Sequence, residues 1–404
     1  MSEGPRAARL SDRQLFDWLR LIRSENVGPR TFRSLVNRFG GAAAALDALP
    51  DLAAQRGRVL KIAAVEDIER EMAAAARHGV RFLTLGDPDY PHLLRNIDAP
   101  PPVLALRGRP DALRRASVAI VGSRNASAAG LAFTERLARG LAQQDYVVVS
   151  GLARGVDARA HQATLDTGTV AVLAGGHDRL YPADHGPLLD RILERGAALS
   201  EMPMGWEPRG RDFPRRNRIV AGLTLGTIVV EAARRSGSLI TAQFAIDHGR
   251  EVFAVPGSPM DPRAEGANDL LRQGATLCAG AGDVVAVLDR QRQESGQASG
   301  QRDLFAEGAG ARPTEQPLWD ELDFLGDGAP VAARSALADE AEESAADPVD
   351  VAARIVALLG PSPVSIDELA RAADAPVSDV RRVLLELEIE GRLARAGVNL
   401  VSLA

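Results

Sequence analysis

Eight short, mostly apolar runs between residues 80 and 255 constrain the fold of this chain most strongly. They are rich in β-branched residues, and amphipathic helical patterns separate several of them. Strands of this kind are buried on both faces, which requires a mostly parallel sheet with helices on each side. The runs are Val80–Leu85, Val103–Arg107, Val118–Val121, Val147–Val149, Val170–Leu173, Ala198–Ser200, Thr227–Val230 and Glu251–Val255. The sequence therefore predicts an α/β protein with a Rossmann-like, doubly wound sheet whose ligands bind beyond the carboxyl ends of the strands.

A length of 404 residues leaves room for further domains beside this sheet, which we assign to residues 79–290. Residues 1–78 show helical periodicity around Trp18, and a Val27-Gly28-Pro29 turn precedes a second helix. This pattern predicts an N-terminal helical domain of the SAM-like or helix-hairpin-helix type. Such a domain can contact a nucleic-acid backbone through turn N–H groups, or it can serve only as a packed helical cap.

Residues 349–404 predict three helices followed by a β-hairpin, which is the pattern of a winged helix. The second helix has Ser365 at its N-cap and Glu368 three residues later, which predicts a capping box. The third helix carries Arg381 and Arg382 but also three glutamates. We therefore favour a protein partner or weak DNA binding over sequence-specific DNA recognition for this domain.

Residues 291–348 are rich in Gly, Ala, Glu, Asp and Gln without sustained periodicity, so we expect a disordered acidic linker. They carry 13 acidic and 4 basic residues, a net charge of −9, so the rest of the chain is +3 although the whole is −6. Within them, Gln301-Arg302-Asp303-Leu304-Phe305 matches the bacterial sliding-clamp pentapeptide, in which Gln301 leads and Leu304 and Phe305 enter an apolar pocket. The sliding clamp is thus a candidate partner, and a chance match is the alternative.

Glycine-rich polar loops follow several strand ends of the predicted sheet. Gly122-Ser123-Arg124-Asn125 follows one strand, Ser150-Gly151-Leu152-Ala153-Arg154-Gly155-Val156-Asp157 another, and Ser236-Gly237-Ser238 with Thr241 a third. Glycine lets the backbone approach a phosphate, and helix N-termini favour anions, so these loops predict a rim for a phosphate-bearing ligand. The sequence has neither a GxGxxG fingerprint in the first of these loops nor a Walker A motif, so we expect neither NAD nor FAD nor ATPase activity.

The segment 209–218 holds five arginines and a single acid, Asp212, around Phe213. An aromatic ring can stack on an unpaired base while arginines neutralise phosphates, so the segment favours single-stranded nucleic acid. A solvated basic turn is the alternative.

Seven ordered blocks between residues 80 and 290 resemble the DNA-processing protein A family (DprA, also called Smf). The blocks are Gly122-Ser123-Arg124, Ser150 to Asp157, Gly175-Gly176-His177-Asp178-Arg179-Leu180-Tyr181-Pro182, Ser200-Glu201-Met202-Pro203, Phe213 to Leu223, Glu231-Ala232 with Ser236 to Ala242, and Val252-Phe253-Ala254-Val255-Pro256-Gly257. The resemblance implies a protein that binds single-stranded DNA and loads the RecA recombinase onto it, bypassing single-strand-binding protein, when DNA enters the cell in natural transformation. It further implies a homodimer formed through the Rossmann-like domain, no enzymatic activity, and no cofactor or metal.

The resemblance also implies a DNA site. Phe213 would stack on a base, and charge would come from nearby arginines. The residues carried over are Gly122, Ser123, Arg124, Gly151, Arg154, Arg211, Phe213, Arg215, Arg216, Asn217, Arg218, Ser238 and Thr241. Family members often carry a lysine near the pocket, and here Arg209 or Arg211 must replace it. Alternatively, Arg216 or Arg218 is a buried ion-pair partner of Glu201 or Glu231.

An enzyme is the main alternative class. Rossmann-like phosphoribohydrolases cleave nucleoside monophosphates with a Pro-Gly-Gly-x-Gly-Thr loop and a glutamate, and Glu231 lies at a comparable strand end. The loop after it here is Arg234-Arg235-Ser236-Gly237-Ser238, which argues against hydrolysis.

Disulfides, metals and membranes have little support in the sequence. Cys278 is the sole cysteine, the pairs His177-Asp178 and Asp184-His185 are expected to be solvated, and Asp157 and His161 are expected to orient a helix. The N-terminus is polar and no apolar run approaches 18 residues, so we expect no membrane segment and a cytoplasmic protein.

Overall fold

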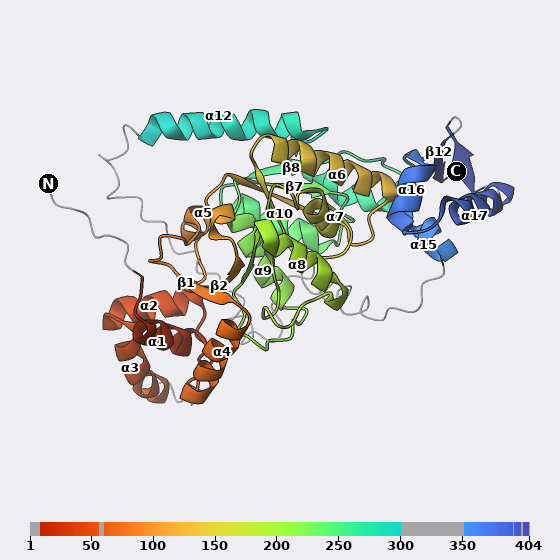
Figure 1. The fold of residues 1–404 in the computed structure, drawn as a ribbon. Helices are drawn as coiled ribbons and strands as arrows, with labels where there is room; N and C mark the ends of the chain where they lie inside the picture. Colours follow the sequence, from red (N-terminus) through yellow and green to blue (C-terminus); the bar gives the residue numbers. More distant parts are fainter. Residues whose placement is uncertain (1–8, 56–59, 300–350, 391, 397–398, 404) are drawn as a thin grey trace.

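The computed structural model describes residues 9–55, 60–299, 351–390, 392–396 and 399–403. At its centre is a nine-stranded sheet with the strand order β1-β2-β6-β5-β4-β3-β7-β8-β9 (Figure 1). The strands are β1 (Val80–Thr84), β2 (Val103–Gly108), β3 (Ser117–Gly122), β4 (Val147–Ser150), β5 (Thr169–Val172), β6 (Ala197–Ser200), β7 (Gly226–Val230), β8 (Glu251–Ala254) and β9 (Thr276–Leu277). Strands β3 to β9 pair in parallel, whereas β1 with β2 and β2 with β6 pair antiparallel. The predicted Rossmann-like, mostly parallel sheet is confirmed.

Helices cover both faces of the sheet, because alternate strand residues point to opposite sides. Val118 and Ile120 of β3 belong to one core and Ala119 and Val121 to the other. The first face is covered by α6 (Ala128–Gln143), α7 (Val156–Ala163), α8 (Gly186–Arg195) and α12 (Ala281–Ser299). The second is covered by α5 (His92–Arg95), α9 (Asp212–Gly222), α10 (Gly237–Asp247) and α11 (Glu265–Arg272). Short 3-10 helices are η1 (Pro110–Leu113), η2 (Ala183–His185) and η3 (Pro262–Ala264).

The N-terminal helices form a small core of their own against the antiparallel edge of the sheet. They are α1 (Asp12–Ile22), α2 (Pro29–Phe39), α3 (Ala42–Gln55) and α4 (Val65–Arg77). Ser11 and Gln14 make a capping box at the start of α1. Leu19 of α1 and Ile68 of α4 pack on Val103 of β2, which attaches these helices to the sheet.

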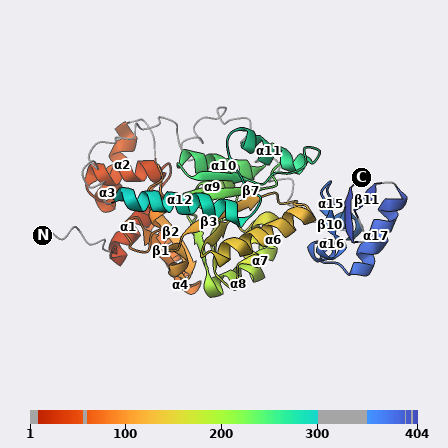
Figure 2. The same cartoon turned by 90° about the horizontal axis from the view of Figure 1, so that it is seen from above.

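The C-terminal residues form the predicted winged helix. Its elements are α15 (Val351–Leu358), β10 (Val364–Ser365), α16 (Ile366–Ala373), α17 (Val377–Ile389), β11 (Leu393–Arg395) and β12 (Leu400–Leu403). The capping box of Ser365 and Glu368 is confirmed, and β10 adds a third strand to the expected hairpin. The winged helix packs against the start of α6, where Ala128 belongs to its core, at the opposite end of the molecule from the N-terminal helices (Figure 2).

Helix α12 runs through Ser299 and thus enters the range that we assigned to a linker. The clamp-like residues Gln301, Leu304 and Phe305 lie outside the described residues.

Candidate nucleic-acid interface

A cavity of about 200 Å³ lies at the carboxyl ends of β3, β4 and β7, where the sequence predicted a polar rim. We call it the rim cavity. Its lining residues are Val121, Gly122, Ser123, Arg124, Asn125, Ala153, Asp157, Arg216, Asn217, Ala233, Arg235, Ser236, Gly237, Ser238 and Thr241. Ser236 caps helix α10 by accepting a hydrogen bond from the N–H of Ser238, so the positive end of that helix faces the cavity. Three arginines and one aspartate line the cavity, which makes it suited to an anion.

Arg216 forms the floor of the rim cavity, because α9 carries it under the ends of β4 and β5. Its guanidinium donates hydrogen bonds to the carbonyl oxygens of Gly151 and, at 3.2 Å, Val172. Arg216 as a whole is only 6% exposed to solvent. A Cβ atom at Gly151 would overlap this guanidinium, so the glycine of the second loop is required by the arginine.

Asp157 holds the same loop from the other side. Its carboxylate accepts hydrogen bonds from the N–H groups of Gly151 at 3.0 Å and Ala153 at 3.4 Å, which confirms that it orients the start of α7. Burial raises the pKa of Asp157, against the lowering effect of the Arg216 charge and of these backbone hydrogen bonds. His161, one turn later, is buried and lies 2.8 Å from the Thr169 hydroxyl, and burial lowers its pKa to about 3.

Phe213 lies beside the rim cavity but is only 6% exposed. The Arg124 guanidinium lies over its ring at 5.2 Å from the centroid, and Tyr181 packs edge-on with ring centroids 5.4 Å apart. The sequence predicted an open stacking surface at Phe213, whereas Arg124 covers that surface here. In this structure Arg124 therefore blocks that face of the ring.

Arg218 is a correction to the predicted site. Its guanidinium makes two hydrogen bonds of 2.6 Å to the Glu201 carboxylate, and a third of 2.5 Å to the Ala99 carbonyl oxygen. The two side chains are 4% and 6% exposed. Burial acts to raise the pKa of Glu201, but the charges of Arg218 and Arg215 outweigh it and lower the pKa. Arg218 is therefore the buried structural partner that we gave as the alternative.

The prediction that Arg211 and Arg215 belong to the same site is also wrong, because they line a different cavity. Both belong to a groove between the N-terminal helices and the sheet rather than to the rim cavity. Arg154 stands at the outer edge of the rim, where it is about half exposed and lies 3.5 Å from Asp184. Arg209, a suggested lysine replacement, lies over the Trp206 ring at 5.1 Å.

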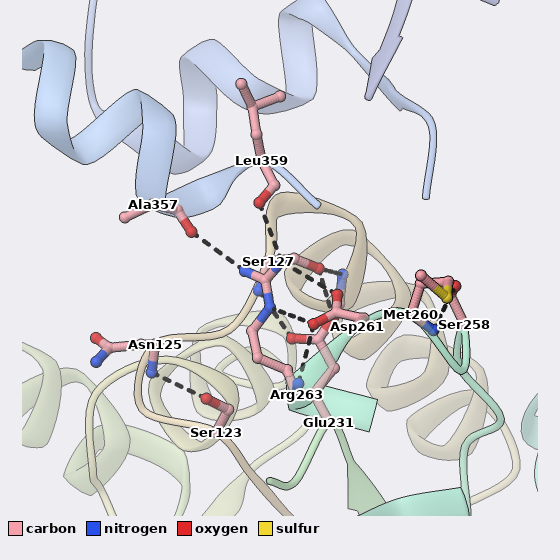
Figure 3. Close-up of polar contacts among 11 residues, drawn as sticks. Ser123, Asn125, Ser127, Glu231, Ser258, Met260, Asp261, Arg263, Ala357 and Leu359 are labelled. Carbon is pink, nitrogen blue, oxygen red and sulfur yellow. Dashed lines mark hydrogen bonds and ion pairs between the residues drawn. The ribbon is translucent and has the colours of Figure 1, made fainter. Parts of the chain in front are cut away.

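Glu231, the residue that a hydrolase would need, has a structural role (Figure 3). It follows β7 with a φ of 47°, and its carboxylate accepts hydrogen bonds from the Ser127 N–H at 2.8 Å and from the Ser127 hydroxyl. A Cβ atom at Gly130 would overlap this carboxylate. Glu231 thus caps the start of α6, where an acid is favoured by the helix dipole.

Sequence reasoning missed Arg235 as a rim residue, and it treated Asn125 and Ser236 only as parts of loops. The available signal was the pair Arg234-Arg235 directly before the Ser236 cap of α10, because charges beside a helix N-terminus lie close to any anion bound there.

The expectation that the two histidine pairs are solvated is wrong for His177, which is buried. His177 Nε2 lies 3.1 Å from the Ala105 carbonyl oxygen, and burial lowers the pKa of His177 to about 4. His185 Nδ1 lies 2.9 Å from the Leu152 carbonyl oxygen. Among the described residues, no group of three or more His, Cys, Asp or Glu side chains could hold a metal ion.

The fold and the rim together define a Rossmann-like α/β protein with an arginine-lined cavity at the carboxyl ends of its strands. The family model described as DNA recombination-mediator protein A matches residues 81–289. Models of a DprA-like N-terminal HHH domain and a DprA winged helix domain match residues 12–74 and 339–397. The chain belongs to the DNA recombination-mediator protein A family.

Individual relatives agree with this assignment. Protein Smf of Synechocystis is 33% identical over 333 residues, which cover 78% of each chain. DNA processing protein DprA of Bacillus subtilis is 39% identical over 55% of this chain and 75% of its own. The X-ray structure of DprA from Streptococcus pneumoniae, 38% identical, superposes with a TM-score of 0.51 over 55% of this chain and 80% of that one.

No helix in the described part of the chain is both long and apolar enough to cross a membrane.

Proposed function

We propose that this protein binds single-stranded DNA at the rim cavity and loads RecA recombinase onto it. The observation that carries the proposal is the convergence of Arg124, Arg216 and Arg235 with the N-terminus of α10 on one small cavity. A phosphate bound there meets two sources of positive potential at once, the guanidinium groups and the helix dipole. The family description, a recombination mediator, agrees with this use.

Arg124 and Phe213 together hold both the phosphate and the base of a nucleotide. Arg124 belongs to the rim cavity and also covers Phe213. When a phosphate enters, Arg124 turns toward it and uncovers the ring, on which an unpaired base then stacks. A duplex presents no free base face to this ring, so single strands are preferred.

A homodimer through the sheet edge is part of the proposal. In the described sheet, β9 is an edge strand and exposes Leu277 at 51%. A strand edge with an exposed apolar side chain is suited to pairing with a second copy. Action on DNA that enters the cytoplasm in natural transformation, and sliding-clamp binding through Gln301, Leu304 and Phe305, remain proposals drawn from the sequence.

Anisotropy titration of a labelled oligo-dT tests the DNA site. We expect Arg124→Ala to bind on the order of tenfold more weakly than wild type, and the salt dependence to fall by about 0.7 per lost phosphate contact. Arg139→Ala, an exposed arginine toward the other end of α6 that pairs with Glu135, is the matched control and should bind as wild type does.

Equal binding by Arg124→Ala and Arg139→Ala, or tighter binding of a duplex of the same length, would show that the rim cavity is not the DNA site. If the variants bind as expected, RecA filament formation on DNA coated with single-strand-binding protein then tests the loading step.

A further inference from the structure

Helix α17 of the winged helix exposes apolar side chains on the face that points away from the core of its domain. Leu385 is 54% exposed and Ile389 is 80% exposed. They lie four residues apart and are therefore neighbours on one side of the helix. The side chains on the opposite side are buried, and they are Val380, Val383, Leu384 and Leu387.

The whole outer face of α17 is accessible. Ser378, Arg382, Leu385 and Ile389 follow one another at spacings of four, three and four residues, so they form one row along the helix. All four are exposed. Figure 1 and Figure 2 show α17 at the end of the molecule that points away from the sheet. We call this row the outer face of α17.

The composition of α17 is unfavourable for DNA. In helix-turn-helix folds the corresponding helix lies in the major groove, where its side chains donate to base edges and neutralise phosphates. Helix α17 carries two basic and three acidic residues, and two apolar side chains stand in the middle and at the end of its outer face. This surface therefore suits another protein surface better than a nucleic acid.

The charged side chains of α17 form one pair of opposite sign on each side of the outer face. At 3.6 residues per turn, Arg381 and Glu388 lie on one flank, and Arg382 and Glu386 lie on the other. All four are exposed. On both flanks the arginine is nearer the N-terminus and the glutamate nearer the C-terminus, so each flank changes sign along the helix.

This arrangement is complementary to a second copy that runs in the opposite direction. A two-fold axis between Leu384 and Leu385 brings each flank of α17 against the same flank of the other copy, with its direction reversed. Arg381 then lies level with Glu388 of the second copy, and the arginine of the other flank lies within one residue of its glutamate. A parallel pair would instead place arginine beside arginine and glutamate beside glutamate.

The apolar side chains fit the same arrangement. In the antiparallel pair, the Leu385 side chains of the two copies meet at the axis. Ile389 lies level with the space between Ser378 and Arg382 of the second copy, which is a hole of the kind that a side chain fills in paired helices. The exposed apolar surface of both copies is thereby removed from water.

The ion pairs within one chain oppose this exchange only weakly. Arg382 lies 3.4 Å from Glu386, and Arg395 lies 2.8 Å from Glu388. The side chains of both pairs are between 39% and 60% exposed. Exposed pairs contribute little to stability, so they exchange for pairs across the axis at small cost.

We propose that α17 pairs with α17 of a second copy of this chain in this antiparallel arrangement. The contact is separate from the rim cavity and from the sheet edge and forms without DNA, so it does not rest on the proposed function. A helix of 13 residues is about 20 Å long, so the pair buries less than the roughly 1,000 Å² of a stable interface. The contact is weak between free chains and gains strength where other contacts hold the chains close together.

Sedimentation velocity of the full chain over a concentration series, without DNA, tests for this association. We expect the double variant Leu385→Gln/Ile389→Gln to associate about tenfold or more weakly than wild type, because it removes the apolar contact from both copies. Glutamine is a good helix former and both positions are exposed, so the fold is kept, which the melting temperature verifies. Met260→Gln is the matched control, because Met260 is 83% exposed on a different surface.

Two charge variants separate a contact between copies from an effect within one chain. Arg382→Glu and Glu386→Arg each set like charges against one another across the axis, so each alone should associate several-fold more weakly than wild type. In an equimolar mixture of the two variants, both arginines of one chain face both glutamates of the other. We therefore expect the mixture to recover the association of wild type, whereas a defect within the single chain would not be repaired by mixing.

Engineered cysteines test the direction of the pair. Cys278 is the only native cysteine and is buried. Under copper catalysis dissolved oxygen accepts the two electrons and two protons that a pair of thiols loses as the disulfide forms. Leu385→Cys should give a disulfide-linked dimer readily. Ser378→Cys should not, because its two copies lie about 20 Å apart along the antiparallel pair.

Each result either supports the proposal or overturns it. Weaker association of Leu385→Gln/Ile389→Gln, recovery in the mixture and cross-linking only at Leu385→Cys support it. Association equal to wild type in Leu385→Gln/Ile389→Gln, no recovery on mixing, or equal cross-linking of Ser378→Cys and Leu385→Cys would each overturn it. A different protein then becomes the better occupant of the outer face of α17.

Discussion

At the scale of single residues, the rim depends on how closely backbone and side chains approach. Gly151 is the clearest case, because the Arg216 guanidinium occupies the space where any other residue would place its Cβ atom. The carbonyl oxygen of the same glycine accepts a hydrogen bond from that guanidinium. One position thus fixes both the loop and the cation on the floor of the rim cavity.

We expect Gly151→Ala to destabilise the protein by about 1–3 kcal/mol, the usual cost of overpacking a filled site. It should also weaken binding of single-stranded DNA, since Arg216 must leave its place. Thermal unfolding and anisotropy measure the two effects. Gly282→Ala in α12 is the matched control, because a Cβ atom there meets nothing within 4 Å. A melting temperature of Gly151→Ala equal to that of Gly282→Ala would contradict the packing argument.

At the scale of elements, helix α9 organises both surfaces. Arg216 and Asn217 face the rim cavity and Arg215 faces the groove between the N-terminal helices and the sheet. Arg218 instead points inward and binds Glu201 just after β6. The buried ion pair fixes the rotation of the helix about its axis, which in turn sets where the other arginines point.

The Glu201–Arg218 pair gives this anchor a pH dependence. The pKa of Glu201 in the fold lies below its ordinary value of 4.5. Its contribution to the free energy of unfolding is therefore complete above pH 4.5 and is lost as the pH falls through the lowered value. We expect the wild-type denaturation midpoint to fall more steeply on acidification in this window than that of Glu201→Gln. Urea titrations at several pH values measure the difference, and parallel pH profiles would contradict it.

Helix α9 illustrates which structural features a sequence pattern predicts and which it does not. The strands, the rim loops and the winged helix follow from periodicity and cap residues such as Ser365 and Glu368, which are local signals. Which of several consecutive arginines turns inward depends on Glu201, a residue 17 positions away from Arg218 and on another element. Likewise, the covering of Phe213 by Arg124 and the assignment of Arg211 and Arg215 to a separate groove depend on contacts distant in sequence.

At the scale of the whole molecule, the two appended domains stand at opposite ends of the molecule and are held differently (Figure 2). The winged helix is held partly by Arg263, whose guanidinium donates to the carbonyl oxygens of Ala357 at 3.1 Å and Leu359 at 3.0 Å (Figure 3). Asp261 orients that guanidinium from behind, with an ion pair of 3.0 Å.

We expect Arg263→Ala to weaken docking of the winged helix by about 1.5–3 kcal/mol for each lost charged hydrogen bond, while both domains stay folded. Small-angle scattering should show a larger radius of gyration, and amide exchange should rise at the start of α6. Arg272→Ala, an exposed arginine of α11 paired with Asp269, serves as control. An unchanged radius of gyration in Arg263→Ala would mean that apolar contacts around Ala128 suffice for docking.

The antiparallel strands β1 and β2 connect the N-terminal helices to the rest of the sheet. Helix α4 leads directly into β1, β1 pairs with β2, and β2 pairs with β6, whose end continues into the loop that bears Met202 and Trp206. The two walls of the groove between the N-terminal helices and the sheet are therefore connected through neighbouring, hydrogen-bonded strands. The Arg23 guanidinium connects them a second time, because it donates a hydrogen bond to the Glu201 carbonyl oxygen at 3.0 Å. Because they are connected in this way, the two walls keep their separation without a closing movement, and no free energy of binding is spent on bringing them together.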